Sequence, residues 1–168
     1  MPALTAWCYG TPLGATAGSV RLRRMEQARA LDVIDAIVVS WAPGAHRPRV
    51  TWSWSWDEVG QREPSVLVAL LRTSFAAAST HASLPAHLTH QFAAAGLDPD
   101  FLQAVIARLS QRTSALLVLS GEADLSVVVP AVRQRIVSGD VALLQSELPA
   151  DGPERLRAAL GLEAPRSD

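Results

Sequence analysis

The stretch SALLVLS at residues 114–120 decides the fold of this chain. It is an unbroken apolar run between polar boundaries, which is typical of a strand buried on both faces in the middle of a sheet. ALTAWCY at 3–9 has the same two-sided apolar character and predicts a second central strand. DAIVVSW at 35–41 and VALLQSEL at 141–148 supply two further strands, so we expect the core to be built on a sheet.

Helical patterns separate these strands. The first helix is predicted from about Thr16 to Leu31, with an inward stripe of Val20, Met25, Ala28 and Leu31. A later helix opens with Asp98 as its N-cap and Pro99 at the first helical position. Residues 124–139 form an amphipathic pattern that is expected to turn four side chains inward: Leu125, Val128, Val132 and Ile136.

A strand with alternating tryptophans, RVTWSWSW at 49–56, follows a turn and is predicted to pair antiparallel with 35–41. Alternation places Val50, Trp52, Trp54 and Trp56 on one face and the intervening hydroxyl residues on a wet face. Three indoles would expose several hundred Å² of apolar surface, which soluble monomers rarely leave bare. The predicted cover is first the helical segment 64–96, then a second copy of the chain, then a flat ligand.

Taken together, the element order predicts an α+β protein. The expected architecture is a ferredoxin-like split β-α-β antiparallel sheet with an extra edge strand and an inserted helical segment. We expect a single domain over residues 1–162, with 64–96 as the helical insert and 163–168 as a disordered tail.

Composition excludes several classes of function. The chain has 168 residues, 49% hydrophobic and 18% charged, with a formal net charge of −1. Such a balance gives no global field for nucleic acid, and we expect no nucleic-acid partner. The N-terminal residues lack the charged segment of a signal peptide, and the longest apolar run contains Arg72, so no spanning helix is predicted. The expected location is the cytoplasm, with peripheral membrane contact through 64–80 as an alternative.

Three motifs carry a family resemblance. They are the Gly-Leu-Asp-x-Asp-Phe helix start at Gly96 to Phe101, the Thr-Ser-Ala-Leu strand at Thr113 to Leu116, and the terminal Leu-x-x-Ala-Leu at Leu156 to Leu160. With them the chain resembles the bacterial domain-of-unknown-function family numbered 1269, described as predicted membrane proteins. The resemblance implies a bacterial origin, a ferredoxin-like soluble part and a stress-related role, and it supplies no catalytic residues. The family's long glycine-rich hydrophobic hairpin is missing between 64 and 96.

Candidate chemical sites are few. His81, His87 and His90 have a loose metal-ligand spacing, but exposed or capping histidines are the favoured interpretation. Cys8, on a central strand, is expected to be packed and unreactive. The segment YGTPLGATAGS could cradle a phosphate, yet it matches no nucleotide fingerprint and is interpreted as a turn.

From these observations no catalytic residue, cofactor or resident metal is assigned. The leading hypothesis is a non-enzymatic bacterial interaction or scaffold protein that self-associates, with Trp52, Trp54 and Trp56 as its interface. The alternative is a small-molecule-binding or catalytic α+β dimer with a pocket between the sheet and the inserted helices. That alternative would place His87, His90 or Glu58 inside a concave apolar site.

Overall fold

The sheet organises this computed structural model, which describes residues 1–54, 64–78 and 84–162. Its five antiparallel strands lie in the order β3-β2-β4-β1-β5. They are β1 (Ala3–Tyr9), β2 (Leu31–Ser40), β3 (Arg49–Ser53), β4 (Ser114–Ala123) and β5 (Val141–Glu147). The two apolar runs that predicted central strands are β4 and β1, and both lie inside the sheet, as predicted.

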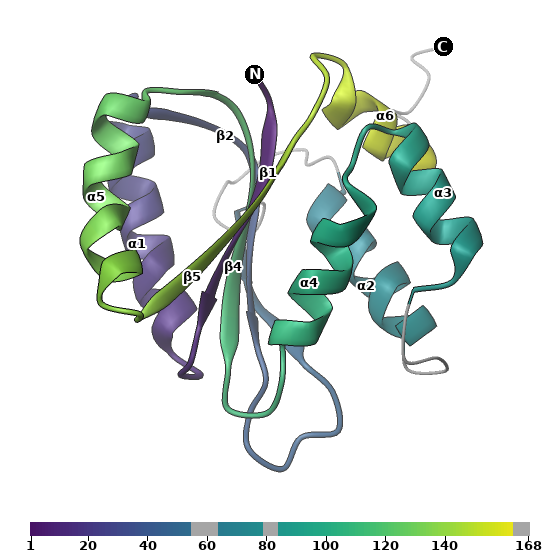
Figure 1. Ribbon diagram of the computed structural model, residues 1–168, viewed down its shortest axis with the longest axis horizontal. Helices are drawn as coiled ribbons and strands as arrows, with labels where there is room; N and C mark the ends of the chain where they lie inside the picture. Colours follow the sequence, from purple (N-terminus) through teal and green to yellow (C-terminus); the bar gives the residue numbers. More distant parts are fainter. Residues whose placement is uncertain (55–63, 79–83, 163–168) are drawn as a thin grey trace.

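Six helices cover the two faces of the sheet (Figure 1). The face toward the left of the view carries α1 and α5, and the other carries the remaining four. Their bounds are α1 (Gly14–Gln27), α2 (Val66–Ala78), α3 (Ala86–Ala94), α4 (Pro99–Arg108), α5 (Leu125–Val137) and α6 (Gly152–Ala159). The predicted α+β class is therefore confirmed.

On one face the core is closed. The region 64–96 is expected to be helical, and its described residues contain two helices, α2 and α3, which pack with α4 and α6 over β2, β4 and β1. Phe92 of α3 and Leu67 and Leu70 of α2 are at most 1% exposed. The apolar side chains of 64–78 that could have contacted a membrane are therefore largely buried in this core. No helix in the described part of the chain is long and apolar enough to cross a bilayer.

On the other face α1 differs from its predicted stripe. The helix starts at Gly14 and ends at Gln27, and Leu31 begins β2. Val20, predicted inward, is 50% exposed, while Leu22 and Met25 are buried. The inward surface of the first turns is made of small residues, because the Tyr9 ring of β1 fills the space beneath them. A pattern based on large apolar residues therefore misses this face.

The α5 prediction is partly wrong for a related reason. Val128 and Val132 are partly buried against the sheet, as expected, but Ile136 is exposed. The side chain of Leu125 lies outside the described set. Since α5 packs chiefly over β5, the last strand of the sheet, no further strand extends beneath its outer flank. Aliphatic side chains on that helix remain uncovered.

A β-bulge changes the predicted face of the tryptophan strand. β3 pairs with β2 as expected, but the register shifts between Val38 and Val39. One extra residue reverses the side-chain alternation beyond it. Val50 consequently packs on the α2 side, whereas Trp52 packs on the α1 side. The prediction that Val50 and Trp52 share a face is wrong.

Helix ends follow the local signals. Asp98 caps α4 by accepting a hydrogen bond from the Asp100 N–H at 2.9 Å. Gly161, predicted as a C-cap, follows α6 with φ +70°, a left-handed conformation that favours glycine. The predicted tail, 163–168, lies outside the described residues.

Candidate functional site

The tryptophan strand is only partly covered. Trp52 and Trp54 are half-buried and pack edge to face, with ring centroids 6.0 Å apart. The guanidinium carbon of Arg23 in α1 lies 5.2 Å from the Trp52 ring centre, within cation–π range. The first-choice cover, the inserted helices, is therefore wrong for these two indoles, because those helices lie on the opposite face. Trp56 lies outside the described residues.

The hydroxyl face of that strand is not wet throughout. Ser53 is fully buried and lies opposite Ile37 on the side covered by α2. The bulge and the inserted helices together place a small polar side chain inside the core. Trp52 and Trp54 remain partly exposed on the α1 side, and their role as an interface stays a prediction.

The two histidines of this set that the structure describes lie on the surface of α3. His87 and His90 are both exposed on α3, on either side of the buried Leu88. His81 and Glu58 lie outside the described residues. Among those described, no group of three histidine, cysteine or acidic side chains is arranged to hold a metal ion.

The glycine-containing turn after β1 is held by serines. Ser114 Oγ accepts a hydrogen bond from the Ala15 N–H at 3.0 Å and donates one to the Thr11 carbonyl at 2.6 Å. Ser40 donates to the Pro12 carbonyl at 2.9 Å. One amide at the start of α1, which a phosphate could have used, is thus satisfied by β4. The geometry favours the structural interpretation of this turn.

Cys8 and Tyr9 are neighbours that point to opposite faces of the sheet. Burial raises the pKa of the Cys8 thiol, and the Arg108 guanidinium opposes that shift. Cys8 is therefore mostly a thiol at neutral pH, as predicted for a packing residue. Burial also raises the pKa of Tyr9, against the charges of Arg21 in α1 and Arg135 in α5. The Tyr9 hydroxyl is buried and has no hydrogen-bond partner among the residues that the structure describes.

A buried carboxylate, missed by the sequence analysis, links the sheet to the inserted helices. Asp35 in β2 is 5% exposed, and its Oδ2 accepts hydrogen bonds from the Leu67 N–H at 3.0 Å and the Ser65 hydroxyl at 2.8 Å. These donors stand at the start of α2, where a negative charge is favourable. An aspartate in the middle of VIDAIVV was the available signal, since a charge is rarely buried in a strand without a partner.

One shallow, open depression of about 440 Å³ lies at the end of the sheet where β2 starts and β4 ends. Its lining is mainly charged: Glu26, Arg29, Asp32, Glu122 and Asp124, with Ala30, Leu31 and Ala123. None of its lining residues belongs to the inserted helices, against which the alternative hypothesis placed a pocket.

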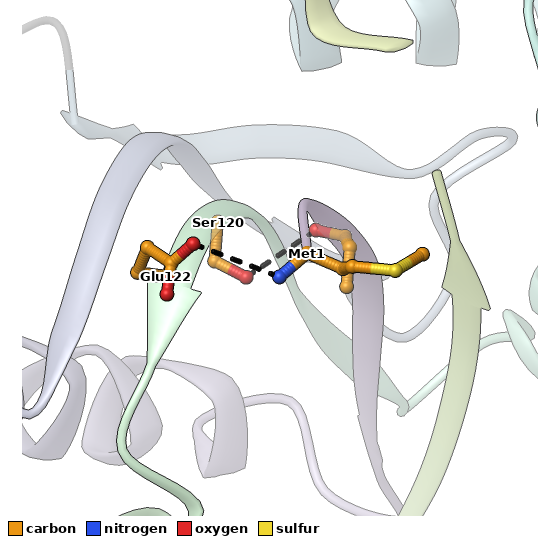
Figure 2. A network of polar contacts seen from close by, with 4 residues as sticks. Met1, Ser120 and Glu122 are labelled. Carbon is orange, nitrogen blue, oxygen red and sulfur yellow. Dashed lines mark hydrogen bonds and ion pairs between the residues drawn. The ribbon is translucent and has the colours of Figure 1, made fainter. Parts of the chain in front are cut away.

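Figure 2 shows the polar contacts beside this depression. The Met1 amino group lies 3.9 Å from Glu122 Oε1, and Ser120 donates to the Ala3 carbonyl at 3.4 Å. Both charged groups are at least 70% exposed, so the ion pair contributes little to stability. These contacts fasten the start of β1 to β4 and offer no convergent set of catalytic groups.

Comparison with known proteins adds no identification. The chain matches no protein-family model, no curated protein and no solved structure.

Proposed function

We propose that this chain is a non-enzymatic bacterial interaction or scaffold protein that self-associates in the cytoplasm. The observation that carries the proposal is the uncovered aliphatic surface of α5. Four of its side chains are 38–80% exposed: Val127, Val129, Ile136 and Val137. Exposed apolar surface of this kind marks sites of interaction with other molecules.

The proposed architecture is ferredoxin-like. Its support is the order β2-β4-β1-β5, in which α1 and α5 lie on the same face and β3 extends the β2 edge. The resemblance to family 1269 rests on sequence motifs and supports a bacterial, stress-related setting. Fold resemblance by itself carries no activity.

The alternative, a catalytic or ligand-binding dimer, has less support. The space between the sheet and the inserted helices is filled by apolar side chains, including Leu70, Phe92 and Val105. The two described histidines that it invoked, His87 and His90, face solvent.

Native mass spectrometry over a concentration series, on protein purified without added ligand, tests the proposal. We expect a population at twice the 17.9 kDa chain mass that grows with concentration. A monomer at every concentration up to about 100 µM, where contacts with Kd near 1 mM still populate some dimer, would contradict it. Added mass that disappears on denaturation would instead support the ligand-binding alternative.

A further inference from the structure

The outer edge of β5 carries a regular set of backbone groups that have no partner strand among the described residues. The Leu148 N–H donates to the Pro2 carbonyl at 2.9 Å, in register with the β1–β5 ladder. In an antiparallel ladder, residues that face the partner strand alternate with residues that face away. The residues of β5 that direct their N–H and C=O groups outward are therefore Val141, Leu143, Gln145 and Glu147.

The two edges of the sheet differ in how they resist pairing. β3 has five residues, begins with Arg49 and is bulged against β2. β5 has seven residues, pairs with β1 without any register shift, and contains no proline or lysine. Short, bulged or charged edges discourage strand addition, whereas a regular edge of this kind invites it. Among the described residues β5 pairs with β1 alone.

The helix over this edge turns an apolar flank toward it. The charge of Arg135 opposes the burial that raises the pKa of Tyr9, whose ring lies beneath Gly14 and Gly18 of α1. Arg135 therefore lies on the flank of α5 that faces α1. Helical periodicity places Val129, Arg133 and Ile136 on the opposite flank. That flank lies on the open side of β5, and all three side chains are exposed.

We propose that two copies of this chain join through β5 about a two-fold axis, forming one continuous ten-stranded sheet. This inference rests on the proposed self-association and names its surface. In the register that uses the whole strand, Val141 lies opposite Glu147 of the second copy and Leu143 opposite its Gln145. The four outward-facing residues of each strand then exchange backbone hydrogen bonds with their opposites. No pair of like charges is brought together.

Helix contacts complete the interface. A seven-residue strand pair alone falls short of the roughly 1,200–2,000 Å² that stable interfaces bury. The Val129 and Ile136 stripes of the two α5 helices lie on the same side of the joined sheet and supply additional apolar area. Glu147 projects on the α5 face of β5. It shares a face with Leu143, which pairs with Trp7, and Trp7 belongs to the core under α1 and α5. In this register Glu147 lies beside the start of the second copy's β5, which directly follows that copy's α5. The side chain of Arg133 on that α5 can then pair with Glu147.

The first test is Gln145→Pro, which removes an outward N–H and leaves the bonds to β1 in place. We expect the dimer Kd measured by light scattering to rise at least tenfold, with the circular dichroism spectrum unchanged. Val129→Glu, at an exposed helix position, is the second variant and should weaken the dimer without affecting folding. Trp52→Ser tests the competing interface on β3 and is expected to leave the dimer intact.

The second test is a charge exchange. Glu147→Arg and Arg133→Glu should each raise the dimer Kd about tenfold, because each places like charges together at both symmetry-related contacts. The double variant should restore the wild-type Kd. Within one chain Glu147 lies about 20 Å along β5 from Val141, so rescue reports a contact between copies.

The outcomes separate the two proposals. If the dimer survives Gln145→Pro, Val129→Glu and Glu147→Arg, the β5 interface is overturned. If the dimer is then lost in Trp52→Ser, the interface lies on β3 and the proposal of self-association still holds. A wild-type chain that stays monomeric overturns self-association itself. If Gln145→Pro does not fold, Val129→Glu and the charge exchange decide. Weakening without rescue in the double variant overturns the register.

Discussion

The two faces of the sheet are built differently. The face under α2, α3, α4 and α6 is sealed by large apolar side chains, and the described part of the insert adds directly to it. The face under α1 and α5 depends on glycines packed against one tyrosine and on a helix that leaves four of its described aliphatic side chains exposed to water. We therefore expect one face to supply most of the stability, while the other keeps apolar surface available for contact.

The largest effect is expected on the sealed face. Phe92→Ala should lower the free energy of unfolding by about 3–5 kcal/mol, because it leaves a cavity among side chains that cannot collapse into it. Urea denaturation measures the change. Ile136→Ala on α5 is the matched control and should cost less than about 1 kcal/mol in the monomer. Similar losses in the two variants would remove the contrast between the faces.

The next effect concerns the joint between β2 and the insert. Asp35→Ala should cost about 2 kcal/mol, since the Leu67 N–H and the Ser65 hydroxyl lose a buried, charged acceptor. Asp35→Asn keeps an acceptor oxygen and should lose less. Hydrogen exchange should show the loss concentrated in α2. An even loss across the whole molecule would mean that Asp35 supports the sheet and not this joint.

A smaller effect tests the α1 face. Gly18→Ala should cost about 1–2 kcal/mol, because the new methyl group would meet the Tyr9 hydroxyl. Tyr9→Phe removes a buried hydroxyl that has no partner in the described part of the chain and should be neutral or stabilising by about 1 kcal/mol. Combining the two should recover part of the Gly18→Ala loss in a double-mutant cycle. Strict additivity would show that the hydroxyl is not the obstacle.

The smallest effect should appear at the start of α5. Asp124 accepts hydrogen bonds from the Ser126 hydroxyl at 2.6 Å and the Ser126 N–H at 3.0 Å, and these bonds lower the pKa of its carboxyl below 3.8. A carboxyl whose pKa is lowered by folding stabilises the folded state at pH values above its pKa in the unfolded chain. That stabilisation is lost as the pH falls through its pKa in the folded chain. Amide exchange at the start of α5 should therefore accelerate as pH falls below about 4, after correction for intrinsic rates. Asp124→Ala should be fast already and lack this pH dependence.

Local signals determined much of the fold. The unbroken apolar runs predicted β1 and β4 as central strands because only a strand covered on both faces needs apolar residues at every position. The Asp98–Pro99 pair predicted the start of α4, since an N-cap acts within one turn of its own helix. Both signals lie within a few residues of the structure that they specify.

Other features depended on contacts between distant segments. The alternation of RVTWSWSW suggested one apolar face, but a bulge against β2 moved Val50 to the other side. Asp35 gained its partners from α2, about thirty residues later in the chain. The pattern of α5 predicts an inward stripe, yet Ile136 is exposed because that helix lies over the last strand of the sheet.

The sequence by itself determined which segments are strands and helices, where several helices begin, and that the chain is an α+β protein. Tertiary structure alone decided which side each half of β3 faces, which helix remains uncovered, and which edge of the sheet is regular. The physical reason is that hydrophobic periodicity records how much of a side chain is buried, but not by what. The partner depends on register and strand order, which long-range packing sets.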